Sequence, residues 1–160
     1  MIIKIGDNLF DLRKRPLIMG ILNVTPDSFS DGGRYYSFDD AINHAIRMEK
    51  EGADIIDIGG ESTRPGAVSV PISAEMSRVM PVVKELSNEL KIPVSIDTYK
   101  SEIAEKAIVL GASMVNDISA LRFDEKLARV VAEKKVPICL MHMKGTPSNM
   151  QTNPVYENVV

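Results

Sequence analysis

Five short apolar runs, separated by amphipathic stretches, are the feature that most constrains the fold of this chain. The runs are rich in Ile and Val and bounded by Gly, Pro or polar residues, and they lie at 17–24, 54–59, 93–98, 113–119 and 137–142. Strands buried on both faces of a parallel sheet have this composition. The chain is therefore predicted to be an α/β protein built from repeated strand–helix units.

Helices are predicted in the gaps between these runs. Their expected positions are 37–52, 73–90, 101–111 and a fourth helix that begins at 124. Ser37 and Asp40 have the spacing of a capping box, and Pro81 is expected to kink the second helix. Residues 2–12 alternate in polarity and turn at Gly6, which predicts a hairpin ahead of the repeated units.

The repeated units are compatible with two architectures, an open doubly wound sheet and a closed (β/α)8 TIM barrel. A weak internal repeat supports the unit itself, because EGADIID at 51–57 matches LGASMVN at 110–116. Polar residues stand near the end of almost every predicted strand, and a barrel brings all these ends to one mouth. No glycine fingerprint for dinucleotides and no P-loop follows the first strand. The barrel is preferred, and an open five-strand sheet is the alternative.

The length of 160 residues is short for such a barrel, which typically takes about 250. Five parallel strands would leave two long edges unpaired. Val159 and Val160 are interpreted as the start of another helix. We therefore expect one domain, residues 1–160, that represents about five of eight βα units in a truncated chain or a fragment.

Composition limits the classes of partner. The 19 Lys and Arg against 22 Asp and Glu give a net charge of −3, so no basic field would hold nucleic acid or an anionic membrane. A lone Cys139 excludes an internal disulfide framework and is expected to be a buried small hydrophobe. No signal peptide and no membrane span is recognisable. A soluble cytoplasmic protein is expected.

The first segment whose residues suit binding or catalysis is GILNVTPDSFSDGG at 20–33. An apolar strand ends at Asn23, whose amide oxygen suits a hard divalent ion such as Mg²⁺. The polar loop after it ends in Gly32 and Gly33, a possible hinge for folding over a ligand. An ordinary surface turn is the alternative.

The second segment is DIGGESTRPGA at 57–67. Arg64 supplies a forked cation, Ser62 and Thr63 supply hydroxyls, and the glycines allow close approach of backbone N–H groups. This chemistry suits a phosphate, pyrophosphate or carboxylate. The alternative is a flexible turn in which Arg64 pairs with Glu61.

The third feature is a set of polar strand ends. Asp97 ends one predicted strand, and Asn116 and Asp117 end the next. Buried carboxylates need donors, which come either from the protein or from a ligand rich in N–H groups, such as the amino-amide edge of a pterin. Met141 and Met143 are candidates for an apolar wall beside a flat ring.

Taken in this order, the segments resemble the dihydropteroate synthase family. NVTPDSFSDGG and DIGGESTRPG are long and specific, and SIDT, VNDI and MHMKGTP add to them. The resemblance spans nearly the whole chain and a little over half of a family member, including an N-terminal hairpin that covers the bottom of the barrel. It implies a pterin-binding TIM barrel, a transferase of folate biosynthesis and a sulfonamide target. Its members condense 6-hydroxymethyl-7,8-dihydropterin pyrophosphate with p-aminobenzoate, with Mg²⁺ as cofactor.

The resemblance also implies roles for the strand-end residues. Asn23 would bind the metal and the pyrophosphate. Asp97, also a catalytic residue, would read the pterin together with Asn116. Ile118 and Met141 would line the pterin pocket.

On the two loops, the resemblance places Thr63 and Arg64 at the pyrophosphate and p-aminobenzoate end of the site. Phe29 and Pro65 would shape the p-aminobenzoate subsite. Asp31 would act catalytically by stabilising the cationic pterin as the C–O bond breaks.

The family further uses an aspartate, a lysine and an Arg-x-His from later strands, and it forms homodimers through its last helices. A purified 1–160 chain is therefore expected to show no measurable synthase activity, and a homodimer is expected only of a full-length enzyme. Two alternatives stay open. A pterin-binding methyltransferase domain would not need the first loop or the S-T-R-P segment, and a non-catalytic pterin-binding fragment would bind without turnover.

Overall fold

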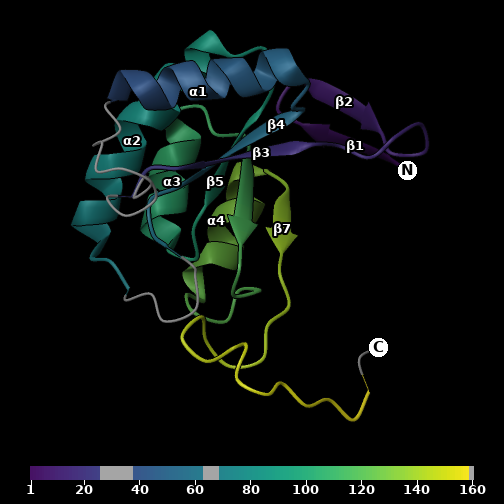
Figure 1. Ribbon diagram of the computed structural model, residues 1–160, viewed down its shortest axis with the longest axis vertical. Coiled ribbons are helices and arrows are strands. Elements are labelled where there is room, and N and C mark those ends of the chain that lie inside the picture. Colours follow the sequence, from purple (N-terminus) through teal and green to yellow (C-terminus); the bar gives the residue numbers. More distant parts are fainter. Residues whose placement is uncertain (26–37, 63–68, 159–160) are drawn as a thin grey trace.

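A computed structural model of the protein describes residues 1–25, 38–62 and 69–158 (Figure 1). An antiparallel hairpin comes first and is followed by five strands and four helices in alternation. The hairpin consists of β1 (Ile2–Ile5) and β2 (Asn8–Asp11). The later strands are β3 (Met19–Asn23), β4 (Ile55–Gly59), β5 (Val94–Asp97), β6 (Met114–Asp117) and β7 (Ile138–Leu140). The helices are α1 (Phe38–Glu51), α2 (Ile72–Glu89), α3 (Ser101–Val109) and α4 (Lys126–Lys134).

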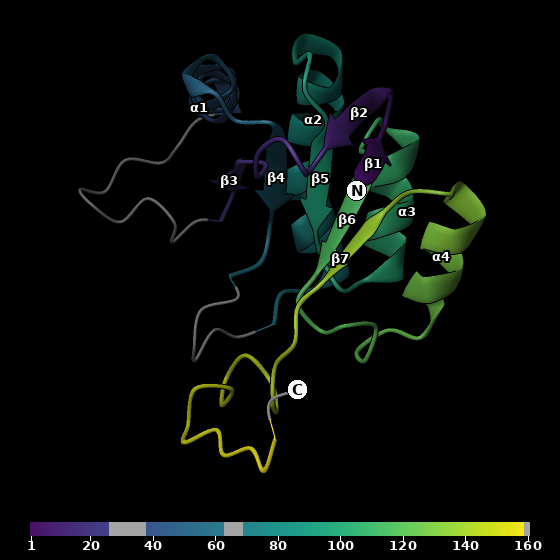
Figure 2. The ribbon, with the colours of Figure 1, turned by 90° about the vertical axis from the view of Figure 1, so that its right-hand side faces the viewer.

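The five strands after the hairpin form one parallel sheet in the order of the chain, β3-β4-β5-β6-β7. A doubly wound sheet reverses its strand order at a switch point, and these five described strands show no reversal. Consecutive helices pack against one another, α1 on α2, α2 on α3 and α3 on α4, so they form one layer outside the strands (Figures 1 and 2). This is the arrangement of part of a TIM barrel, which confirms the predicted fold class.

The core lies between the sheet and this layer of helices. Because successive strand residues point to opposite faces, Leu22, Ile58 and Ile96 face the helices and are almost fully buried. From α2, Val79 and Leu86 are buried in this core. The helix continues through Pro81 as one element, and the kink there remains a prediction.

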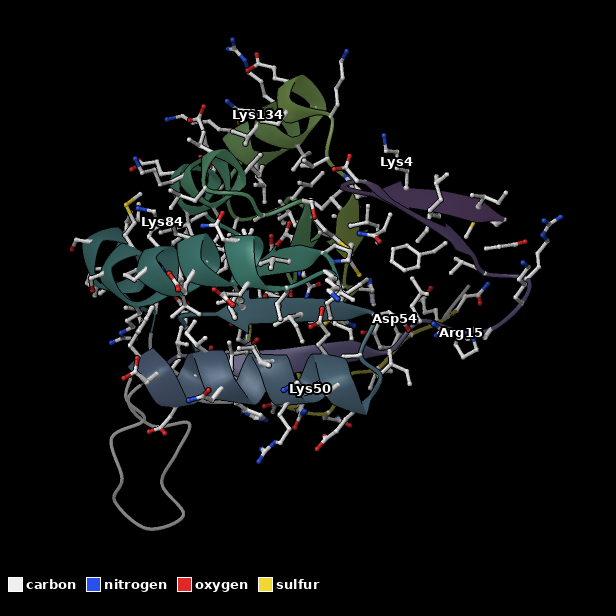
Figure 3. The ribbon with its side chains drawn as sticks, turned by 90° about the horizontal axis from the view of Figure 1, so that it is seen from above. Lys4, Arg15, Lys50, Asp54, Lys84 and Lys134 are labelled. Atoms are coloured by element: carbon white, nitrogen blue, oxygen red, sulfur yellow. The ribbon has the colours of Figure 1, made fainter. Side chains whose placement is uncertain are left out.

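The hairpin lies at the amino-terminal ends of the strands. Its turn contains Gly6, which has a φ of +57° and packs against Ser113, the residue before β6. Arg15, after the hairpin, donates two hydrogen bonds of 2.6 Å to Asp54, the residue before β4 (Figure 3). The hairpin is thereby tied to the end of the barrel opposite the polar strand ends, as the family resemblance implied.

One expectation about the C-terminal part was wrong. Cys139 is exposed rather than buried, because β7 lies at the edge of the sheet and no described strand covers it. After β7, residues 141–158 contain no helix or strand and extend away from the sheet (Figure 2). Val159 and Val160, interpreted as the start of another helix, lie outside the described ranges, as does Ser37 of the proposed capping box.

In residues 1–25, 38–62 and 69–158, every helix is too short or too polar to cross a bilayer.

Candidate functional site

The carboxyl ends of the strands place the predicted polar residues side by side on the face turned away from the helices. In the sheet register, Asp97 lies beside Gly59 on one side and Asn116 on the other. Asn23 lies on the far side of Gly59, since these two residues are partners in the β3–β4 pair. A second row lies two residues earlier in each strand, on the same face of the sheet, and follows the same strand order. It consists of Ile21, Asp57, Ser95 and Met114.

Asn116 is held by a residue from the second row. Its Nδ2 donates a 2.8 Å hydrogen bond to Oδ2 of Asp57, which is 2 % exposed. The other Asp57 oxygen and the Ser95 hydroxyl are both buried without a hydrogen bond of good geometry among the described residues. Burial raises the pKa of Asp57, and the nearby Ser95 and Asn116 offset only part of this effect.

Asp97 carries the largest electrostatic perturbation at these strand ends. Burial raises its pKa to about 8, and the negative charges of Asp57, Glu75, Asp117 and Glu61 add to the effect. At neutral pH this carboxyl group is therefore mostly protonated, and its ionised form accepts N–H groups when a ligand supplies them.

Gly59 leaves the space between Asn23 and Asp97 open. A Cβ atom at this position would lie 3.2 Å from Asn23 Oδ1 and 3.4 Å from Asp97 Oδ2. Two hard oxygen donors thus border one gap, and this donor set suits Mg²⁺ completed by phosphate oxygens and water. The described part of the chain holds no cluster of three His, Cys, Asp or Glu side chains able to bind a metal.

The two apolar candidates lie at the same mouth. Ile118 follows β6 and is 7 % exposed. Met141 follows β7 and is half-buried, and its backbone N–H donates to the Asp117 carbonyl at 3.0 Å. His142 is exposed, and its Nε2 lies 3.3 Å from the Tyr156 hydroxyl.

The structure thus brings together Asn23, Asp97, Asn116, Ile118 and Met141. The other predicted residues lie outside the described ranges. These are Phe29, Asp31, Thr63, Arg64 and Pro65.

Asp117, which the sequence left open between a structural and a binding role, is structural. It is fully buried, and its carboxylate accepts the backbone N–H groups of Ser119 at 2.7 Å and Leu121 at 2.6 Å. This anchors the turn after β6, where Leu121 has a φ of +65°.

Sequence reasoning did not identify Asp57 as a site residue. The signal was a carboxylate near the end of the apolar run at 54–59, one that cannot be buried without a partner. Glu61 was considered only as a partner for Arg64. Among the described residues, its two oxygens accept hydrogen bonds from Lys100, Tyr99 and Val70, whereas Arg64 lies outside the described ranges.

A parallel barrel segment with carboxylates and an amide around its mouth is the architecture of the pterin-binding enzymes. Residues 19–160 match the family profile described as pterin binding enzyme, and the chain belongs to this family.

Within the family, the similar proteins are dihydropteroate synthases. The chain is 49% identical to the enzyme of Synechocystis over 98% of this chain and 54% of that protein. The crystal structure of the Yersinia pestis enzyme with a sulfonamide drug has a TM-score of 0.90 and 46% identity, over 99% of this chain and 57% of that one. The Xanthomonas albilineans enzyme with 4-aminobenzoic acid has a TM-score of 0.83 and 44% identity, over 98% of this chain and 54% of that one. The chain spans about half the length of these relatives.

Proposed function

We propose that the protein serves dihydropteroate synthesis and supplies the substrate-recognition wall of that site. In this reaction the amine nitrogen of p-aminobenzoate bonds to the methylene carbon of 6-hydroxymethyl-7,8-dihydropterin pyrophosphate. The C–O bond breaks, pyrophosphate leaves with the bonding electron pair, and the amine loses one proton. The observation that carries the proposal is the adjacent placement of Asp97 and Asn116 at one mouth, in a chain that is 49% identical to a dihydropteroate synthase.

Asp97 and Asn116 have the right chemistry for the amino-amide edge of a pterin. Because Asn116 donates through Nδ2 to Asp57, its Oδ1 faces the ligand as a hydrogen-bond acceptor. Asp97 supplies a second acceptor when it is ionised, and Ile118 and Met141 form apolar contacts with the flat ring. The ionised Asp97 also stabilises the positive charge that develops on the pterin as pyrophosphate leaves.

Asn23 is the proposed metal residue. It would hold Mg²⁺ together with oxygens of the pyrophosphate, and the bound ion would neutralise charge on the leaving group. Thr63 and Arg64 are proposed to bind the anionic end of the substrates, Phe29 and Pro65 to shape the p-aminobenzoate subsite, and Asp31 to support the cationic pterin. Support for the roles of these loop residues comes from their motifs and from the bound 4-aminobenzoic acid of the Xanthomonas albilineans relative.

The proposal is tested by calorimetry with 6-hydroxymethyl-7,8-dihydropterin pyrophosphate, with and without Mg²⁺. We expect Asp97→Asn to weaken binding at least about tenfold, equivalent to about 1.4 kcal/mol. Asp39→Asn, on the exposed first turn of α1, is the matched control and should bind like the unmodified chain. If Asp97→Asn binds the pterin pyrophosphate as tightly as the unmodified chain does, Asp97 has no role in pterin recognition. If the affinity is the same with and without Mg²⁺, Asn23 has no role in metal binding. Preference for 5-methyltetrahydrofolate over the pyrophosphate would instead favour a methyltransferase.

A further inference from the structure

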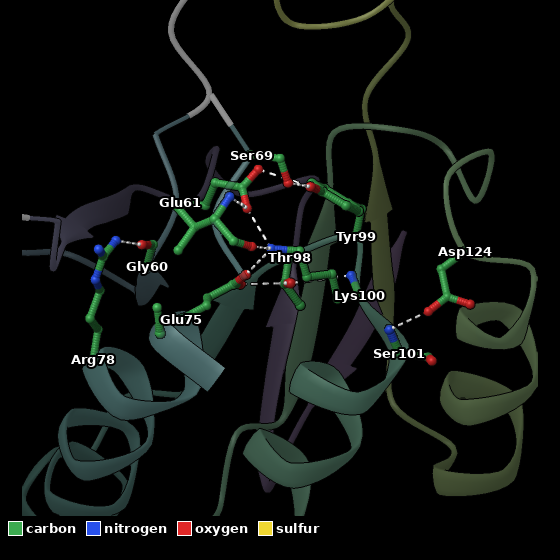
Figure 4. A network of polar contacts seen from close by, with 12 residues as sticks. Gly60, Glu61, Ser69, Glu75, Arg78, Thr98, Tyr99, Lys100, Ser101 and Asp124 are labelled. Atoms are coloured by element: carbon green, nitrogen blue, oxygen red, sulfur yellow. Dashed lines mark hydrogen bonds and ion pairs between the residues drawn. The ribbon is translucent and has the colours of Figure 1, made fainter. Parts of the chain in front are cut away.

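A buried polar network joins both ends of the β4–α2 connection to the residues that follow β5 (Figure 4). We call it the Lys100 clamp. It consists of Glu61, Ser69, Val70, Glu75, Thr98, Tyr99 and Lys100.

The first half of the clamp closes the connection on itself. Glu61, two residues after β4, accepts the backbone N–H of Val70 at 3.1 Å. The Tyr99 hydroxyl donates to Glu61 at 2.9 Å and lies 2.8 Å from the Ser69 hydroxyl. Glu61 and Ser69, which lie on either side of residues 62–68, therefore both contact the Tyr99 hydroxyl.

The second half of the clamp is centred on Lys100, which is 8 % exposed. Its ammonium group contacts Glu61 Oε2 at 2.5 Å, the Val70 carbonyl at 2.7 Å and Glu75 Oε2 at 2.6 Å. Three N–H donors thus meet three acceptors. Burial opposes the positive charge, but the two carboxylates outweigh it, so the pKa of Lys100 is raised and the side chain remains a cation.

The clamp holds more than the packing of α2 requires. Glu75, 1 % exposed in the first turn of α2, already receives the Thr98 hydroxyl at 2.9 Å. The bonds to Glu61 and Ser69 act on the connection, and the bond to the Val70 carbonyl holds the chain just before α2 begins. On its outer side, Glu61, Ser69 and Tyr99 line a cavity of about 260 Å³, together with Phe123 and residues 146–148.

We propose that Lys100, Glu61 and Tyr99 are positioning residues that fix the ends of the segment containing Thr63 and Arg64. The inference rests on the anion-binding role proposed for those two residues. Fixing Glu61 and Ser69 limits where Thr63 and Arg64 can lie, and so favours the geometry that binds an anion. The clamp therefore strengthens binding of the pyrophosphate group and leaves binding of the pterin ring unchanged.

Tyr99→Phe is the sharpest test, because it removes the two hydroxyl contacts and leaves the Lys100 ion pairs in place. Lys100→Met is avoided, since it would leave two buried carboxylates without a cation and threaten folding. Tyr156→Phe is the matched control, because it makes the same change at a tyrosine outside the clamp that contacts His142. Glu61→Gln serves as a second clamp variant.

The first readout is hydrogen exchange of the backbone amides at 62–69, measured in the whole chain. We expect exchange to accelerate at least about fivefold in Tyr99→Phe and Glu61→Gln and to stay unchanged in Tyr156→Phe. The second readout is calorimetry with inorganic pyrophosphate and Mg²⁺ and, separately, with 6-hydroxymethylpterin. The clamp variants should weaken pyrophosphate binding by about three- to tenfold and leave the pterin Kd within about twofold.

Unchanged exchange in both clamp variants, or equal weakening for both ligands, overturns the proposal. Absence of pyrophosphate binding by the unmodified chain would instead overturn the role proposed for Thr63 and Arg64, and the exchange rates would then decide the clamp by themselves.

Discussion

Asn116 and Asp117 are neighbours in the chain, but their side chains lie on opposite faces of the sheet. Asn116 lies on the face turned away from the helices, next to Asp97, and is oriented by Asp57. Asp117 points the other way, is completely buried, and binds the backbone of the following turn. The alternation of side chains along a strand makes this division unavoidable. Only one of two adjacent polar residues can face a ligand in the barrel mouth.

The raised pKa of Asp97 leads to a prediction about pH. A pterin edge that donates N–H groups binds the ionised carboxylate, and the pKa of about 8 means that this form is scarce at neutral pH. Affinity for 6-hydroxymethylpterin should therefore rise between pH 6 and pH 7.5, by at most about tenfold per pH unit. Calorimetry across this range checks the trend. Asp97→Asn should bind weakly and show no rise, and an equally steep rise in that variant would contradict the assignment.

Asn116→Asp should damage both binding and stability. The substitution removes the amide donor from Asp57 and places a second carboxyl group beside it, where one of the two must take up a proton. We expect a loss of about 2 kcal/mol in the free energy of unfolding at pH 8 and at least tenfold weaker pterin binding. Chemical denaturation measures the first quantity. Asn88→Asp on the exposed side of α2 is the control and should cost no more than about 0.5 kcal/mol.

At the scale of elements, one ion pair fixes the hairpin to the barrel. Asp54 is 7 % exposed, accepts both Arg15 hydrogen bonds and also accepts the backbone N–H of Ile18 at 2.9 Å. The Arg15 guanidinium lowers the pKa of Asp54. The carboxylate therefore contributes stability at pH values above the ordinary Asp pKa, and this contribution is lost as the pH falls below that value.

Asp54→Ala is expected to lower the free energy of unfolding by about 1–2 kcal/mol, because the Ile18 N–H loses its acceptor. The difference between variant and unmodified chain should shrink below pH 4, because Asp54 then takes up a proton in the unfolded chain, while its lowered pKa keeps it ionised in the native chain to lower pH. Thermal or urea unfolding at pH 7 and pH 3 tests both statements. Asp11→Ala breaks the exposed pair with Arg13 and should have a clearly smaller effect at pH 7. A difference for Asp54→Ala that is unchanged at pH 3 would contradict the role of the ion pair.

At the scale of the whole molecule, β3 and β7 are the two edges of the five-stranded parallel sheet. Large apolar side chains are exposed near these edges, with Ile21 52 % and Leu140 48 % accessible. Unpaired edges of this kind favour association between chains.

We therefore expect concentration-dependent self-association of the 160-residue chain. The substitutions Ile21→Lys and Leu140→Lys, one at each edge, should reduce it several-fold, which sedimentation velocity would measure. Val109→Lys, at an exposed apolar position at the end of α3 away from both edges, is the control and should leave association unchanged. A chain that stays monomeric at all concentrations would show that the edges do not drive assembly.

Much of the fold was predictable, because local chemistry governs it. Apolar runs located the five described parallel strands, the stretches between them located the four described helices, and the turn at Gly6 located the hairpin. The boundaries shifted by one to a few residues, as at the fourth helix. It begins at Lys126, where Asp124 accepts the backbone N–H of that first residue at 3.0 Å. The exposure of Cys139 was not predictable, because an apolar run does not say whether its strand lies at a sheet edge.

The sequence by itself determined the repeated unit, a strand whose polar end leads into a loop. Through its motifs it also determined the family. The tertiary structure decided which polar residues meet. The parallel register set Asp97 beside Asn116, buried Asp57 beneath Asn116, and turned Asp117 toward the backbone. It also joined Glu61 to Lys100, 39 positions further along the chain. Partners so distant in sequence are chosen by the packing of strands and helices, and no local pattern of residues encodes that choice.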